Sequence, residues 1–322
     1  MADSVLITGG AGFIGSHLAE RFLREGHAVT VLDDLSTGTR EHVPSAATLE
    51  VLDVASEEAR RLIREGGFSL ICHLAAQMDV RHSVADPLHD GRTNVLGTIS
   101  VARGALAAPR PPRVVFASTG GALYGDANEP PHREDVFPEP DSPYGAAKLA
   151  CESYLSYFAR IQGLPVLSLR IGNVYGPRQD PHGEAGVVAI FIGRLLAGEP
   201  LTIFGDGTQT RDYVAVDDIC DAFVRAGRAP IPAARTMHAR ACNLGSGRGT
   251  SIIELAAALG RIAGIEPRMQ FAARRTGEQQ QSFLDVKKAE RLLGWRAHTT
   301  LDEGLRMTFD WFAARPAQKA GA

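Results

Sequence analysis

The octapeptide Thr8-Gly9-Gly10-Ala11-Gly12-Phe13-Ile14-Gly15 lies between an apolar run, Val5-Leu6-Ile7, and an amphipathic stretch that continues to Arg24. Its glycines repeat as Gly9-x-x-Gly12-x-x-Gly15, which suits a tight turn, close backbone approach to a pyrophosphate and helix–strand packing. The helix start then offers free N–H groups and a positive dipole end to phosphates. A glycine-rich turn that binds nothing is the competing interpretation. The strand before and the helix after favour a dinucleotide site, which would include Phe13 and Ile14.

Further short apolar runs, separated by helical patterns, follow through the first two-thirds of the chain. They lie at 29–32, 48–52, 70–74, 114–117 and 166–170. Continuous Val, Ile and Leu runs that alternate with helices indicate a parallel sheet covered on both faces, and parallel strands need right-handed crossovers. The pattern predicts the α/β class, with a doubly wound parallel sheet of the Rossmann type.

The pattern loosens in the last part of the chain, where turn residues multiply. Helical patterns remain at 187–197, 286–293 and 301–312. We therefore expect residues 1–174 to form the dinucleotide-binding domain. Residues 175–322 are expected to form a smaller, mixed α/β lobe that mainly binds substrate.

The composition is that of an ordinary soluble globular protein, with 322 residues, a formal net charge of -3, and 44% hydrophobic and 22% charged residues. Near-neutral charge without basic runs argues against a nucleic-acid partner, and no apolar stretch is long enough to span a membrane. The N-terminus runs straight into a strand pattern without a charged n-region, so we expect no signal peptide and a cytoplasmic protein. Four scattered cysteines, and histidines without ligand spacing, favour neither disulfides nor a metal site.

Acidic residues follow the second and third apolar runs. Asp33 lies roughly 20 residues after the last glycine, the spacing at which a carboxylate accepts hydrogen bonds from the adenosine ribose. A carboxylate there repels a 2′-phosphate and so favours NAD over NADP. Asp34 competes with Asp33 for this role. Asp53 and Val54 end the third run and are predicted to meet the edge of the adenine ring.

Tyr144 and Lys148 form a second chemical signal. On a helix, residues four apart share a face, so the Lys148 ammonium lies one turn from the Tyr144 phenol. Free tyrosine has a pKa near ~10, and a nearby cation favours the phenolate and brings that pKa towards the working range of a general base. Alone, the pair also fits a solvated surface helix. Together with the glycine loop it predicts an enzyme that moves a proton and a hydride.

Ordered motifs run along essentially the whole chain. They are TGGAGFIG (8–15), HLAAQ (73–77), STGGALYG (118–125), SPYGAAK (142–148), RIGNVYGP (170–177), FGDGTQTRDYVAVDDI (204–219), RRTGE (274–278) and LGW (293–295). These motifs resemble the extended short-chain dehydrogenase/reductase family and, within it, the UDP-glucose (UDP-galactose) 4-epimerase group. The resemblance implies a tightly bound NAD, a UDP-sugar substrate and a homodimer, whose four-helix bundle would use helices near 95–107 and 146–158.

By this resemblance, Tyr144 is the catalytic base and acid, and Lys148 holds the nicotinamide ribose. The third member is usually a hydroxyl at the position that is Gly120 here, so the sequence departs from the family pattern. Thr119 is our choice for that role and Ser118 is the alternative. The family pattern also places four further residues against the cofactor, namely Leu74, Ala75, Ala76 and Asn94.

The loop after the fifth apolar run discriminates among reactions. Related 4,6-dehydratases carry Asp-Glu after the catalytic threonine, and 4-decarboxylases tend to carry an acid there too. This chain has Gly120-Gly121-Ala122. By the resemblance, Tyr144 takes the 4-OH proton and NAD takes the hydride, which forms a 4-keto sugar. Without an acid for elimination, this 4-keto sugar can only be reduced again. The resemblance therefore implies epimerisation at C4.

The resemblance also assigns residues to the UDP-sugar. Asn173 would hydrogen-bond the substrate pyrophosphate, and Arg211 and Arg275 would contact the diphosphate. Guanidinium forks suit phosphate oxygens and stay charged. Arg274 competes with Arg275 for this role, and Glu278 would accept hydrogen bonds from the uridine ribose.

Ser282 occupies a position that the family places beside the sugar. A small residue there predicts room for the C2 N-acetyl group of UDP-GlcNAc and UDP-GalNAc. A UDP-glucuronate 4-epimerase, a 4-keto reductase or another nucleotide-sugar enzyme on this scaffold is the alternative activity. A dinucleotide-sensing binding protein is the non-enzymatic alternative, although such a protein needs no activated phenol.

Overall fold

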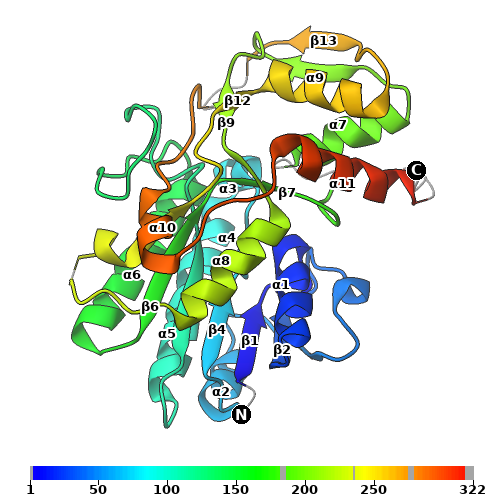
Figure 1. The fold of residues 1–322 in the computed structure, drawn as a ribbon. Helices are drawn as coiled ribbons and strands as arrows, with labels where there is room; N and C mark the ends of the chain where they lie inside the picture. The colour runs from blue at the N-terminus through cyan, green and yellow to red at the C-terminus, as the bar shows by residue number, and fades with distance from the viewer. Residues whose placement is uncertain (1–2, 182–185, 235, 275–278, 316–322) are drawn as a thin grey trace.

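A seven-stranded parallel sheet forms the centre of the computed structural model, which describes residues 3–181, 186–234, 236–274 and 279–315 (Figure 1). The strands lie in the order β11-β6-β5-β4-β1-β2-β3. Their bounds are β1 Ser4–Thr8, β2 Ala28–Asp33, β3 Thr48–Val51, β4 Leu70–His73, β5 Arg113–Thr119, β6 Val166–Ile171 and β11 Ala241–Leu244. With β1 inside the sheet and crossovers running from it to both sides, this order confirms the doubly wound α/β fold. β3 ends at Val51, so Asp53 and Val54 lie just beyond the strand that they were expected to end.

Helices cover both faces of the sheet (Figure 1). α1 (Phe13–Arg24) and α8 (Val216–Arg228) pack on one face, in the core that holds Val5 and Ile7. The other face is covered by α2 (Glu57–Glu65), α5 (Gly97–Ala107) and α6 (Pro143–Ile161), and Leu6 belongs to that core. Because successive strand residues point to opposite faces, burial of both faces explains why the strands read as continuous apolar runs.

Short elements complete this layer. They are η1 (Arg40–His42), α3 (Val80–Ala85), α4 (Pro87–Gly91), the π-helical turn η2 (Arg92–Leu96), η3 (His238–Arg240) and α10 (Lys287–Leu293). None of the described helices is both long enough and apolar enough to cross a membrane.

A smaller lobe lies beyond the carboxyl ends of the strands (Figure 1). Its helices are α7 (Val187–Leu196), α9 (Ile252–Ala263) and α11 (Leu301–Ala313), which share a separate apolar core built around Phe191, Leu255 and Leu305. Three two-stranded sheets accompany them, β7 (Asn173–Tyr175) with β10 (Tyr213–Ala215), β8 (Leu201–Phe204) with β13 (Met269–Ala272), and β9 (Thr210–Arg211) with β12 (Thr250–Ser251).

The second half of the chain also contributes to the first layer. β11 pairs with the edge of β6, α8 packs against α1, and Trp295 after α10 is buried in the same core as Val5. Residues beyond 174 therefore complete the Rossmann layer as well as forming the lobe. That residues 1–174 bind the dinucleotide and residues 175–322 mainly bind substrate stays a prediction.

Candidate active site

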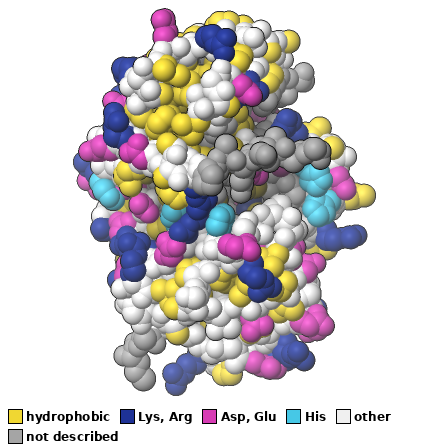
Figure 2. Space-filling view, turned by 90° about the vertical axis from the view of Figure 1, so that its right-hand side faces the viewer, with side chains coloured by type: hydrophobic (Ala, Val, Ile, Leu, Met, Phe, Trp, Pro, Cys, Tyr) yellow, Lys and Arg dark blue, Asp and Glu magenta, His cyan; other side chains and the backbone are white. Residues whose placement is uncertain are grey.

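A cavity of about 2090 Å³ lies where the carboxyl ends of the strands face the lobe. Residues from the Rossmann layer and from the lobe both line this cavity, including Gly12 from the former and Phe191 from the latter. Parallel α/β sheets bind ligands at this edge, close to the point where the strand order reverses. On the face drawn in Figure 2, acidic and basic side chains are interspersed and do not gather into a patch of one sign.

The glycine loop enters this cavity between β1 and α1. Gly9 adopts a φ of +72°, and a Cβ there would lie 2.7 Å from the Ala75 nitrogen. A Cβ on Gly15 would lie 2.1 Å from the Gly9 carbonyl oxygen. Gly12 caps α1 without a side chain, so the backbone N–H groups of the first turn are left for a ligand. Gly9, Gly12, Phe13, Ile14 and Gly15 all line the cavity.

The two adjacent carboxylates after β2 have different environments. Asp33 is buried, lines the cavity and accepts backbone hydrogen bonds from Ala11 (2.9 Å) and Leu35 (2.9 Å). Burial raises the pKa of its carboxyl, while these hydrogen bonds oppose the rise. Asp34 is exposed and accepts from Ser36 within its own loop. Of the two, Asp33 is the better placed for a ribose because it is fixed against the glycine loop.

The remaining predicted cofactor contacts divide into two groups. Asp53, Val54, Leu74, Ala75 and Ala76 line the cavity. Asn94 does not: it is buried in η2, accepts from the Gln77 backbone N–H at 3.0 Å and donates to the Gln77 carbonyl at 2.9 Å. Its amide holds the loop after β4 in place instead of facing a ligand.

Tyr144, Lys148 and Thr119 meet at the cavity wall. Ser142 caps α6 by accepting from the Gly145 N–H, and this places Tyr144 in the first turn. The Lys148 ammonium donates to the Ala117 carbonyl at 3.0 Å and lies 5.9 Å from the centroid of the Tyr144 ring. The Thr119 hydroxyl hydrogen-bonds the Tyr144 phenol.

Burial and neighbouring groups act on the acidity of both Tyr144 and Lys148. Burial raises the pKa of the Tyr144 phenol, the Asp90 carboxylate adds to the rise, and the Thr119 hydrogen bond opposes it. Burial likewise lowers the pKa of the Lys148 ammonium. The lowering of the Tyr144 pKa that the nearby Lys148 cation is expected to give stays a prediction.

The two candidate hydroxyls differ in their partners. Ser118 donates to Glu152 at 2.5 Å, deep between β5 and α6, whereas Thr119 contacts Tyr144. Gly120 occupies the position where the family usually carries the hydroxyl. A Cβ there would lie 2.6 Å from the Leu284 side chain, so a larger residue would require that side chain to move.

The predicted substrate residues are only partly brought together. Asn173 and Arg211 line the cavity, and the Asn173 side-chain oxygen is buried without a hydrogen-bond partner, as a ligand-binding atom would be. Ser282 is buried and does not line the cavity. Arg275 and Glu278 lie outside the described residues.

Gln279 is a lining residue that the sequence reasoning missed. With its amide oriented to suit its neighbours, it donates to the Gly121 carbonyl at 2.5 Å and accepts from the Gly125 N–H at 3.1 Å. Gln279 directly follows the RRTGE motif, and this position was the sequence feature that could have predicted it at the site. Within the described part of the chain, no three His, Cys, Asp or Glu side chains gather as a metal ion would require.

A model of the NAD dependent epimerase/dehydratase family matches residues 5–239 of this chain. The chain belongs to this family. UDP-glucose 4-epimerase of Mycolicibacterium smegmatis is 44% identical over 313 residues, which are 95% of this chain and 97% of that protein. A putative UDP-glucose 4-epimerase of Methanocaldococcus jannaschii is 38% identical, over 95% of this chain and 97% of that protein.

Solved structures of NAD-dependent epimerases share the fold. UDP-glucose 4-epimerase from Thermotoga maritima, in complex with UDP-glucose, superposes with a TM-score of 0.91 at 40% identity, covering 96% of this chain and 98% of that one. UDP-glucose 4-epimerase from Thermus thermophilus, in complex with NAD, superposes with a TM-score of 0.90 at 41% identity, covering 97% of this chain and 100% of that one. The glycine cradle, the uncapped start of α1 and the fixed Asp33 carboxylate all fit such a dinucleotide.

Proposed function

We propose that this protein is an NAD-dependent epimerase that interconverts UDP-glucose and UDP-galactose at C4. The observation that carries the proposal is the meeting of Tyr144, Lys148 and Thr119 at the wall of a cavity that also contains the glycine loop. The epimerases of M. smegmatis and T. maritima, similar along almost their whole length, support the assignment.

The chain's own residues perform the proton chemistry. Bound NAD supplies a reversible hydride acceptor for the sugar C4. Tyr144 takes the proton of the 4-hydroxyl as hydride leaves C4 and gives it back when hydride returns to the opposite face. Thr119 donates a hydrogen bond that stabilises the phenolate, and Lys148 holds the ribose beside it. Asn173 and Arg211 hold the diphosphate, so that the sugar can turn over between the two half-reactions.

The loop composition favours epimerisation over elimination. Gly121 and Ala122 line the cavity beside Thr119, and neither carries an acid that could protonate a leaving hydroxyl. A 4-keto sugar held here returns by reduction. A UDP-glucuronate 4-epimerase is the alternative within the family, since one from Bacillus cereus has the same fold at 28% identity with a TM-score of 0.87.

Use of N-acetyl sugars stays a separate proposal. The proposal was based on the small side chain of Ser282, which would leave room for an N-acetyl group. In this structure Ser282 is buried and does not line the cavity. A Ser282→Tyr variant that retains full activity on UDP-GalNAc would count against the proposed role of this residue.

A homodimer is also proposed, through the helices on one side of the sheet. Several apolar side chains there are exposed to solvent, namely Leu88 (83%), Leu96 (54%), Tyr154 (44%), Tyr157 (43%) and Ile161 (62%). They belong to α4, η2 and α6, two of which overlap the ranges expected to form a four-helix bundle. Exposed apolar side chains grouped on neighbouring helices are typical of a subunit interface. A cytoplasmic location stays a prediction.

The decisive experiment incubates purified protein with UDP-galactose, UDP-GalNAc or UDP-galacturonate without added reductant and follows the C4 epimers by NMR. Conversion of UDP-galactose without net change in NADH supports the proposal. Stoichiometric consumption of added NADH would indicate a reductase instead. If Tyr144→Phe is as active as the wild type, the catalytic assignment is wrong, and if no substrate is converted, a binding function is favoured.

A further inference from the structure

A buried ion pair lies directly behind the proposed catalytic residues. Arg170 on β6 and Glu152 on α6 both have side chains that are 0% exposed. Nε and Nη2 of Arg170 donate to the Glu152 carboxylate at distances of 2.8 to 3.2 Å. Nη1 donates to the Tyr124 hydroxyl oxygen at 2.9 Å and to the Glu134 carbonyl at 3.2 Å. One guanidinium therefore connects the catalytic helix with the loop segment that contains Tyr124 and Glu134.

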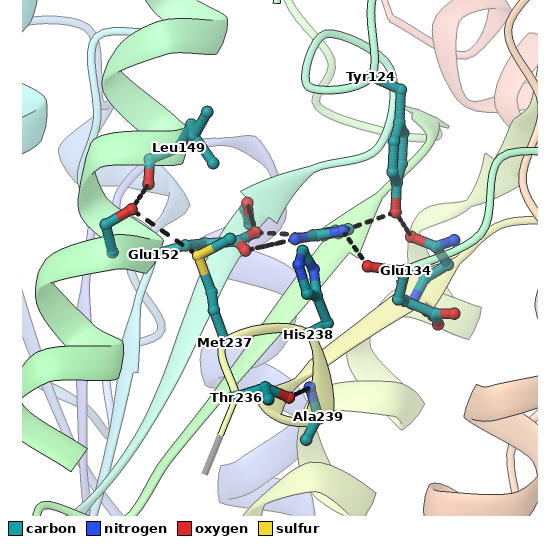
Figure 3. A network of polar contacts seen from close by, with 12 residues as sticks. Tyr124, Glu134, Leu149, Glu152, Thr236, Met237, His238 and Ala239 are labelled. Carbon is teal, nitrogen blue, oxygen red and sulfur yellow. Dashed lines mark hydrogen bonds and ion pairs between the residues drawn. The ribbon is translucent and has the colours of Figure 1, made fainter. Parts of the chain in front are cut away.

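The same network fixes both ends of residues 118–124, which comprise the end of β5 and the turn after it and are called the Thr119 loop below. At its start, the Ser118 hydroxyl donates to Glu152 Oε1 at 2.5 Å. At its end, the Tyr124 hydroxyl donates to Asn243 Oδ1 at 2.7 Å while accepting from Arg170. Figure 3 shows Glu152 on one side of the view and Tyr124 and Glu134 on the other, with dashed lines meeting at the guanidinium between them. The loop is thereby held against α6.

Glu152 lies one helical turn after Lys148, and both side chains are buried. Acidic and basic side chains four residues apart on a helix are close enough to pair. Lys148 instead donates to the Ala117 carbonyl, and its ammonium lies 4.8 Å from the centroid of the Phe116 ring. Glu152 is satisfied by Arg170, so it has no need of Lys148. A buried carboxylate that lost its guanidinium would turn to the nearest cation.

Other charged and titratable groups near the pair do not replace this arrangement. Asp90 acts on both Tyr144 and Lys148, and its carboxylate already accepts from Gln77 (2.9 Å) and Asn94 (3.0 Å). His73 contacts Thr8 and Thr98. Cys151 is the neighbour on α6 itself, and its thiol donates to the Asn94 carbonyl.

We propose that Arg170 is a positioning residue for the reaction: it keeps the Glu152 carboxylate from capturing Lys148 and holds the Thr119 loop against α6. The inference rests on the proposed epimerase function. Arg170 does not line the cavity, so it would act through Lys148 and Thr119.

The test compares Arg170→Met, Glu152→Gln and the double variant Arg170→Met/Glu152→Gln in the UDP-galactose assay. Arg170→Met is expected to lower kcat about 100-fold with KM nearly unchanged, because Asn173 and Arg211 lie elsewhere in the cavity. The acidic limb of its kcat–pH profile is expected to move up by about one pH unit, since Lys148 no longer favours the phenolate. The double variant should recover kcat to within ~10-fold of wild type and restore the pH profile, because it holds no carboxylate to capture Lys148.

Arg113→Met is the matched control. Arg113 lies at the other end of β5 and donates to the carbonyls of Ala226 and Ala229, so its loss should leave kcat and the pH profile unchanged. Thermal melting checks that each variant is folded. If Arg170→Met does not fold, the double variant and Arg170→Lys, which retains the cation, decide the matter.

The outcomes separate the two claims. Two results would overturn the positioning role and leave the epimerase assignment standing. One is a folded Arg170→Met variant whose kcat and pH profile equal those of the wild type. The other is a folded double variant whose kcat stays ~100-fold or more below that of the wild type. Rescue by the second substitution supports the positioning role, since a purely structural defect would deepen when a second buried group is changed. A wild-type protein inactive on every UDP-sugar would overturn the proposed function and the role of Arg170 with it.

Discussion

Thr119 and Ser118 are neighbours in the chain, yet their hydroxyls have different partners. Successive residues of a strand point to opposite faces, and here β5 also ends, so Thr119 is free to turn into the cavity. Ser118 stays between the sheet and α6, bound to Glu152. Although Ser118 also lines the cavity, its bond to Glu152 favours Thr119 as the hydroxyl that assists Tyr144, and this role stays a prediction.

Replacing Thr119 with alanine is expected to lower kcat by about 100-fold, because the Tyr144 phenolate loses a hydrogen-bond donor. Ser118→Ala, the matched control, should change kcat by less than about five-fold. Steady-state kinetics with UDP-galactose measure both. A larger loss in Ser118→Ala than in Thr119→Ala would make Ser118 the catalytic hydroxyl.

His73 is a buried titratable group next to the site. Its ring nitrogens contact the hydroxyls of Thr8 (2.7 Å) and Thr98 (3.1 Å). Burial lowers the pKa of His73 to about 3, and the Lys148 charge adds to the effect. The folded protein therefore keeps this imidazole neutral under conditions in which a solvated imidazole would take up a proton.

Acid is expected to weaken the fold through this residue. Below pH ~6.5 the unfolded chain binds a proton at His73 that the folded chain refuses, so stability falls as the pH drops from about 6.5 towards 3, by up to ~1.4 kcal/mol per pH unit. Urea unfolding between pH 7.5 and 5 measures the slope. His73→Gln should flatten it, whereas His82→Gln, at an exposed position, should leave it unchanged. Burial also lowers the pKa of His17 and His132, so part of the slope should remain.

At the level of elements, α1 depends on close backbone contact at its first turn. Gly15→Ala places a Cβ 2.1 Å from the Gly9 carbonyl oxygen. We expect a loss of about 1–3 kcal/mol of stability and of most bound NAD, because the loop must shift to accommodate the methyl group. Gly91→Ala is the control, since a Cβ at that position would meet nothing within 4 Å and the φ of Gly91 is -62°. That change should stabilise the protein by ~0.5–1 kcal/mol.

Thermal unfolding, with NAD released by denaturation and quantified by its absorbance, distinguishes these two variants. Retention of full NAD content by Gly15→Ala would show that the loop tolerates a side chain at this position and would contradict the packing argument.

The elements that follow from local pattern were predictable. Each apolar run became a strand, and the helices expected at 187–197, 286–293 and 301–312 appear as α7, α10 and α11, with ends within one residue of expectation. β11 was not predicted as part of the sheet, because Ala-Cys-Asn-Leu is short and only its pairing with β6 reveals its place.

The candidate site was predictable where a motif is continuous in sequence. The glycine loop and the Tyr144/Lys148 spacing place their side chains by local geometry alone. Asn94 and Ser282 were expected at a ligand but do not line the cavity, because their orientations depend on packing against distant segments. The Arg170–Glu152 pair was missed since an arginine inside an apolar strand has no visible partner in a linear sequence.

For the whole molecule, the exposed apolar side of α4, η2 and α6 leads to a prediction about assembly. A charge at Leu96 would be buried unpaired in each copy of the proposed dimer, so Leu96→Glu is expected to weaken association by about 100-fold or more. Sedimentation equilibrium measures this effect. Phe271→Glu, at an exposed residue of β13 in the lobe, should not change association. A wild-type protein that is monomeric at all concentrations would contradict the dimer.

The position of β11 beside β6 has a consequence for how the protein is made. Synthesis proceeds from the N-terminus at ~5–20 residues per second, so the glycine loop and the Tyr144 helix leave the ribosome seconds before β11 does. Asn243 on β11 is the partner of the Tyr124 hydroxyl. A nascent chain therefore has its nucleotide-binding strands and its catalytic helix before the loop between them is anchored, first by Asn243 on β11 and then by the later residue Gln279, which bonds Gly121 and Gly125. A growing chain therefore has its nucleotide-binding and proton-transfer residues well before it has the later segments, from β11 to Gln279 and α11, that complete the wall of the cavity.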